Sequence, residues 1–168
     1  DTIADTRLLP TEDRLRNLLT FRSQVRGPAD AETLQGIGSL LAESQGLPME
    51  RVLLSSLPQV FALLETAGEE DSALIRSVVA TLSQGMEADL ATFPAEDSGR
   101  IAALADAAAL DRYTYQVAGC VGEFWTAITM AHTPGLAHWD GVRMGELGVR
   151  FGRALQMTNV LRDVPKDL

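Results

Sequence analysis

The sequence contains few of the residues that mark several common classes of protein. Cys120 is its one cysteine, so no internal disulfide can form, which suits a reducing compartment. The two histidines have no metal-ligand partners at suitable spacing, and no phosphate-binding loop or dinucleotide fingerprint occurs. There is no signal peptide and no apolar run of about 18 residues. We therefore expect a soluble protein of the cytoplasm.

Positive charge is also scarce. Lys and Arg number 14 against 23 Asp and Glu, which leaves a net charge of −9. Such a chain is a poor candidate for nucleic-acid binding and for electrostatic docking on anionic membranes. Anionic substrates remain open, because metal ions can bridge carboxylates and phosphates. The hydrophobic fraction of 46% is ordinary for a globular domain with a core.

Proline and glycine divide the chain into segments of helical periodicity, and none alternates like a strand. We predict helices at residues 1–8, 11–26, 31–43, 48–66, 71–93, 100–131 and 141–168. Thr11 is predicted to cap the second helix, Pro58 to kink or split the fourth, and Asp71 or Ser72 to cap the fifth. These helices predict one all-α domain over residues 1–168. Because both ends already look functional, we expect this chain to be part of a longer protein.

Two pairs of aspartates have i, i+4 spacing, one pair at each end of the chain. Asp1 and Asp5 form the first pair, and Asp163 and Asp167 form the second. On a helix each pair lies on one face, where like charges repel unless a cation sits between them. Mg²⁺ prefers oxygen ligands and is commonly shared between carboxylates and substrate phosphates. The pairs therefore indicate either Mg²⁺ binding or two solvated helix faces.

The second pair belongs to a longer polar stripe. Gln156 and Asn159 precede it, and the four residues follow one another at steps of three, four and four. All four side chains would lie on one helix face, which predicts a polar site, with a plain exposed face as the alternative. Pro165 is expected to disturb the last turn and to bend Asp167 out of register.

The longest predicted helix contains the letters DRYTYQVAGCVGE. Tyr113 and Gln116 are predicted to lie on one face, which Val117 extends. Gly119 and Gly122 would let another helix or a ligand approach the backbone closely. The segment therefore indicates either a substrate-contacting surface or helix packing with satisfied tyrosines.

Three segments resemble the squalene and phytoene synthase family and occur in the family's order. The letters YTYQVAGCVG are similar to its Y-x-x-x-VAG-x-VG segment. The letters LQMTNVLRD are similar to LQ-x-TN-ϕ-ϕ-RD, where ϕ is apolar, and DTIAD resembles the first aspartate-rich motif. The resemblance spans the chain. It implies an isoprenoid-synthase-type helical bundle around a central cavity, with this chain as the central portion of the catalytic domain.

The resemblance also implies roles for individual residues. The aspartate pairs would face each other across the cavity, and Mg²⁺ would be held there by Asp1, Asp5, Asn159, Asp163 and Asp167. Substrate would be contacted by Gln156, Asn159, Arg162, Gln116 and Val117. Tyr113 would act in catalysis together with the four aspartates. Lys166 departs from the family pattern, because members often carry an acidic residue just before the last aspartate.

The implied reaction joins two farnesyl diphosphates head to head into presqualene diphosphate, which NADPH then reduces to squalene. The letters GEFW that follow the tyrosine segment resemble bacterial squalene synthases most. The alternatives are a phytoene or dehydrosqualene synthase without a reductant, a non-catalytic assembly protein on the same fold, and a helical interaction module. The expected cofactors are Mg²⁺ and NADPH, and peripheral membrane association is expected to serve product release.

Overall fold

A computed structural model describes residues 2–6, 9–43, 47–93 and 100–167, with side chains as far as residue 163. All regular structure within these ranges is helical, which confirms the predicted all-α class. None of the described helices is long and apolar enough to cross a membrane. The chain divides into two compact units, Asp1–Leu90 and Ala91–Leu168, and each is described by itself. The single domain over residues 1–168 stays a prediction.

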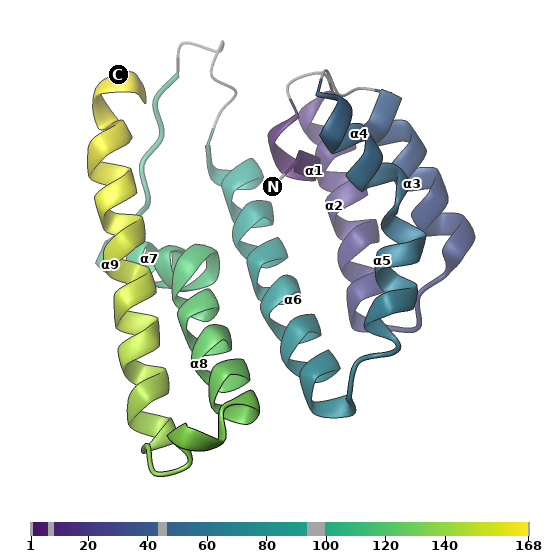
Figure 1. Cartoon of the computed structure of the whole chain (residues 1–168). Coiled ribbons are helices and arrows are strands. Elements are labelled where there is room, and N and C mark those ends of the chain that lie inside the picture. Colours follow the sequence, from purple (N-terminus) through teal and green to yellow (C-terminus); the bar gives the residue numbers. More distant parts are fainter. Residues whose placement is uncertain (1, 7–8, 44–46, 94–99, 168) are drawn as a thin grey trace. The chain divides into compact units, whose positions relative to one another are not determined.

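The first unit is a group of helices (Figure 1), and their buried side chains form one apolar core. Its helices are α1 (Thr2–Asp5), α2 (Thr11–Arg26), α3 (Ala31–Glu43), α4 (Pro48–Ser55), α5 (Leu57–Leu64) and α6 (Glu69–Thr92), whose end lies just beyond the unit. The most deeply buried side chains are Leu18, Leu34 and Leu41. The ring of Phe21 meets that of Phe61 edge to face, with centroids 5.8 Å apart. These residues join α2, α3 and α5, and other members of the core come from α1, α4 and α6.

The helices α3 and α4 touch through their backbones at Gly38. A Cβ atom at this position would lie 2.3 Å from the carbonyl oxygen of Leu54. Real Cβ atoms do not approach a backbone oxygen so closely, so a glycine is needed for this contact.

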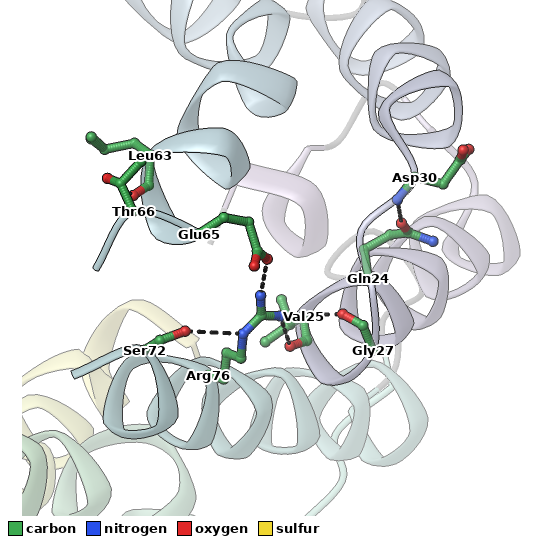
Figure 2. Close-up of polar contacts among 9 residues, drawn as sticks. All are labelled: Gln24, Val25, Gly27, Asp30, Leu63, Glu65, Thr66, Ser72 and Arg76. Carbon is green, nitrogen blue, oxygen red and sulfur yellow. Dashed lines mark hydrogen bonds and ion pairs between the residues drawn. The ribbon is translucent and has the colours of Figure 1, made fainter. Parts of the chain in front are cut away.

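Arg76 joins three parts of the first unit (Figure 2). Its guanidinium donates to the carbonyl oxygens of Val25, at 2.7 Å, and Gly27, at 3.2 Å. It also pairs with Glu65 just after α5, and its Nε donates to the Ser72 hydroxyl at 3.3 Å. The last carbonyl groups of a helix have no donor within the helix and carry partial negative charge. Arg76 therefore stabilises the end of α2 while it anchors α6.

Several helix boundaries test the predictions. Pro58 was expected to kink or split its helix, and the chain is indeed divided there into α4 and α5. The predicted cap at Thr11 is wrong, because Pro10 is the cap residue and the Thr11 hydroxyl accepts from Arg14 at 3.0 Å. The helix α6 begins at Glu69, so the caps predicted for it two and three residues later are wrong as well.

The second unit consists of α7 (Ala107–Thr114), a π-helical turn η2 (Tyr115–Gly119), α8 (Cys120–His132), a short 3-10 turn η3 (Pro134–Leu136) and α9 (Gly141–Asp167). Figure 1 shows α8 and α9 side by side, joined by a short connection. The predicted helix over 100–131 is wrong at its start. Asp106 caps α7 by accepting from the amide of Ala109 at 2.7 Å, and the π-helical turn then interrupts the α-helix.

Glycines bring α9 into backbone contact with α8 and with η2. A Cβ at Gly122 would lie 1.9 Å from the carbonyl oxygen of Gly148. A Cβ at Gly152 would lie 2.4 Å from the carbonyl oxygen of Ala118. The close approach predicted at Gly122 is therefore made by a helix. At Gly119 the nearest atoms belong to side chains and begin at 3.1 Å.

Candidate functional site

The first aspartate motif lies on α1. Asp5 is exposed at the end of this short helix, whereas Ile3 and Ala4 are buried. Arg14 of α2 donates from Nη1 to the carbonyl oxygen of Ala4 at 2.8 Å, which holds the end of α1 in place. Asp1 lies outside the described residues, so its pairing with Asp5 stays a prediction.

The second motif lies on the C-terminal part of α9. The Nδ2 atom of Asn159 is 3.5 Å from the Oε1 atom of Gln156, at the long limit for a hydrogen bond. Asp163 follows one turn later, with 34% of its side chain exposed. The helix continues through Pro165 to Asp167, whose side chain lies outside the described part of the chain. The helical backbone thus carries the predicted polar stripe as far as the structure describes side chains.

Arg162 binds the carboxylate of Asp163 through two donors. Its Nε lies 2.9 Å from Oδ1, and its Nη2 lies 2.8 Å from Oδ2. Two parallel bonds form the strong geometry of arginine–carboxylate pairs. The carboxylate also raises the pKa of the guanidinium. A cation that binds Asp163, or an anion that binds Arg162, must therefore compete with this pair.

The donor atoms of the stripe fit a Mg²⁺ ion in kind. Gln156, Asn159 and Asp163 offer amide and carboxylate oxygens, which this ion prefers. Within the described ranges, however, no three acidic, histidine or cysteine side chains come together. A complete site would need a further carboxylate, and the side chain of Asp167 on the same helix lies outside those ranges.

The tyrosine-rich segment forms a π-helical turn that sequence reasoning missed. The turn η2 contains Gln116 and Val117, both half-buried. A π turn adds a residue to the α-helical register, and such turns are frequent at functional sites. The prediction that Tyr113 shares a helix face with these two residues assumed a uniform α-helical period, which the π-helical turn interrupts. The one local signal was Gly119 at the end of the turn, because glycine has low helix propensity.

The two tyrosines of this segment have different surroundings. Tyr113 is half-buried near the end of α7 and meets the ring of Phe93 at a steep angle, with centroids 6.4 Å apart. Tyr115 donates its hydroxyl to the Oε2 atom of Glu123 at 2.8 Å. This hydrogen bond to Glu123 raises the pKa of Tyr115, and partial burial adds to the effect. Tyr115 and Glu123 therefore form a polar pair that the sequence did not single out.

Arg153 of α9 contacts the tyrosine of this pair. Its guanidinium carbon lies 5.4 Å from the centroid of the Tyr115 ring, within the range of a cation–π contact. Its Nη1 lies 3.0 Å from the Oδ1 atom of Asp111 in α7. Arg153 also precedes Gln156 by three residues, so it extends the polar stripe of α9 toward η2.

A groove of about 570 Å³ lies between α8 and α9. Its walls are largely apolar and include Ala127, Met130, Val142 and Val149. Glu123 and Glu146 line it as well. Glu123 therefore belongs both to the wall of this groove and to the pair with Tyr115.

The described chain is an all-helical protein whose sequence motifs lie on α1, on the α7–η2–α8 segment and on α9. A sequence model described as squalene/phytoene synthase matches residues 1–168, so the chain belongs to the squalene/phytoene synthase family. It is also similar to a protein of Arthroderma gypseum named bifunctional lycopene cyclase/phytoene synthase. The two are 34% identical over 97 residues, a stretch that covers 57% of this chain and 16% of that protein. No solved structure matches the chain.

Proposed function

We propose that the protein containing this chain catalyses the Mg²⁺-dependent head-to-head condensation of two prenyl diphosphates. The observation that supports the proposal is the family match over all 168 residues. A non-catalytic relative would be expected to have lost its acidic residues or its tyrosine. The sequence here retains both aspartate pairs and Tyr113. The name of the Arthroderma gypseum protein includes phytoene synthase, which agrees with the class of reaction.

The acidic residues would bind the diphosphate end of the substrate through the metal. Asp163 and Asn159 would hold Mg²⁺ together with Asp1, Asp5 and Asp167. When bound, Mg²⁺ would supply the charge compensation that makes diphosphate a good leaving group.

Cationic and aromatic side chains would act beside this metal site. Arg162 is already placed next to Asp163 and would offset further diphosphate charge once that ion pair opens. Gln156, together with Gln116 and Val117 of the π-helical turn, would contact the substrate. Tyr113 would stabilise the allylic cation through its ring face or relay a proton through its hydroxyl.

The product is the finer part of the proposal. Formation of squalene from farnesyl diphosphate with NADPH remains our first choice, because the letters GEFW resemble bacterial squalene synthases. The name of the Arthroderma gypseum relative favours a phytoene-type product, which needs no reductant. Because either hydrocarbon would enter a lipid phase, we predict peripheral membrane association for product release. A cytoplasmic location also stays a prediction.

Product analysis with the full-length protein tests both parts. Farnesyl or geranylgeranyl diphosphate is supplied with Mg²⁺, with and without NADPH, and the lipids are identified. Squalene that forms only with NADPH would support the first choice, whereas a polyene formed without NADPH would assign the alternative. Asp163→Ala should abolish either product, while Glu70→Ala, a change at an exposed carboxylate on α6, should not. A folded wild-type protein that turns over neither substrate would contradict the proposal.

A further inference from the structure

The ring of Tyr115 packs against Gly119 and Arg153. A Cβ at Gly119 would come within 3.1 Å of the ring atom Cδ2. The guanidinium carbon of Arg153 lies 5.4 Å from the ring centroid. The same Cβ would be 3.3 Å from Cγ of Arg153, so the ring, the glycine and the arginine stem pack as one group. The hydroxyl at the far end of the ring donates to Glu123.

Arg153 is itself held by an ion pair with Asp111 of another helix. Its ion pair with Asp111 reaches α7, while its contact with Tyr115 reaches η2. One side chain from α9 therefore contacts both the helix before the π-helical turn and the turn itself. Tertiary packing supplies most of the stability of helical segments in proteins, so an irregular turn depends on contacts of this kind.

We propose that Arg153 is a positioning residue that holds Tyr115 against Glu123 across the π-helical turn. The placement follows from side-chain geometry, and only its effect on turnover rests on the proposed function. Gln116 and Val117 lie in the same turn, and Glu123 lines the groove between α8 and α9. A displaced Tyr115 would therefore change the surface predicted to contact substrate.

Arg153 influences the Tyr115 hydroxyl in two opposite ways. By holding the hydroxyl on Glu123, it maintains the hydrogen bond that is the main cause of the raised pKa of Tyr115. Its own positive charge lowers that pKa, whereas the negative charge of Cys120, when this thiol is ionised, raises it. The Asp111 carboxylate faces Arg153 from α7 and moderates its charge. A positioning role and a purely electrostatic role therefore predict opposite changes when Arg153 is replaced.

The test uses the full-length protein in which the tyrosines carry ¹³C at Cζ. Its pH is titrated while NMR monitors the tyrosine resonances. The Tyr115 resonance is assigned by its loss in Tyr115→Phe. A positioning role predicts a lower pKa for Tyr115 in both Arg153→Met and Arg153→Lys, because lysine keeps the charge without the planar, forked guanidinium. Arg150→Met replaces an exposed arginine three residues earlier on α9 and should leave the titration unchanged.

The electrostatic alternative gives a different result. A higher pKa for Tyr115 in Arg153→Met, with the wild-type value in Arg153→Lys, would overturn the proposal. Circular dichroism checks the folding of each variant. If Arg153→Met does not fold, Arg153→Lys decides alone, because a pKa no lower than in the wild type also overturns the proposal. Glu123→Gln is the positive control and should lower the pKa of Tyr115 by removing the acceptor's charge.

Turnover gives a second measurement. We expect kcat/KM in Arg153→Lys to fall by about 10-fold to 100-fold, because a misplacement of roughly 1 Å caused by a mutation outside the reacting groups can cost about 100-fold. A parallel loss in Arg150→Met would argue against a specific role of Arg153. If the wild-type protein converts no prenyl diphosphate, the proposed function fails, while the titration still decides how Tyr115 is held.

Discussion

Replacing Gly122 by alanine should force α8 and α9 apart. The new Cβ would lie 1.9 Å from the carbonyl oxygen of Gly148 and 2.5 Å from its carbonyl carbon. Both are backbone atoms, so no side-chain rotation can relieve the contact. To bring this distance to the 3.4 Å of an ordinary contact, the two backbones would have to separate by roughly 1.5 Å in a closely packed interface.

Two opposing terms set the size of the effect. Alanine is favoured over glycine in a helix interior by about 1 kcal/mol. Overpacking a core costs about 1–3 kcal/mol, and occasionally more. The separation would also loosen the neighbouring contact of Gly152 with Ala118. Because the contacts are with backbone atoms, we take the upper end of the overpacking cost and expect the free energy of unfolding to fall by about 2 kcal/mol in Gly122→Ala.

Urea unfolding followed by tryptophan fluorescence measures this loss. Both tryptophans of the sequence, Trp125 and Trp139, lie in the second unit and report on it. Gly145→Ala is the matched control on α9, because its Cβ would meet no atom within 4 Å. This control should be stabilised by up to about 1 kcal/mol. If Gly122→Ala proved as stable as Gly145→Ala, the argument from backbone contact would be refuted.

Three further predictions concern other parts of the molecule. Arg76→Met should lower the free energy of unfolding of the first unit by about 2–3 kcal/mol, because the partly buried carbonyl groups of Val25 and Gly27 lose a charged donor. Hydrogen exchange measures this loss. An equal loss in Arg26→Met, which replaces an exposed residue on α2, would contradict the reason given. Hydrogen bonds from Thr33 lower the pKa of Asp30. The Asp30 carboxylate therefore stabilises the fold above the pKa that this group has in the unfolded chain, and this stabilisation is lost as pH falls through its pKa in the folded protein. Thermal melts of wild type and Asp30→Ala should therefore differ at neutral pH and converge in acid, and a constant difference would exclude this linkage. Burial raises the pKa of the Cys120 thiol to about 11, so its alkylation at mildly alkaline pH should be slow until urea unfolds the protein. Peptide mass spectrometry measures the rate of alkylation. Rapid alkylation of the native protein would contradict the burial of Cys120.

The sequence predicted the helical class and many of the helix boundaries, because both depend on local signals. Proline lacks an amide donor and clashes within a helix, so Pro58 marked the division between α4 and α5. The limits of α3 and the start of α9 followed in the same way from neighbouring glycine and proline residues. The spacing of Gln156, Asn159 and Asp163 also placed them on one stripe of a helix, since the helical period depends on the backbone alone.

Other features depend on residues that are distant in the sequence, so only the tertiary structure decided them. The π-helical turn is accompanied by contacts from Arg153 on another helix, and no local period indicates it. The sequence predicted a close approach at Gly122, but only the packing of α8 on α9 identified Gly148 as its partner. The pairing of Tyr115 with Glu123 likewise depends on how that turn directs a side chain. Local propensity thus determined where helices form, whereas packing between helices determined which side chains meet.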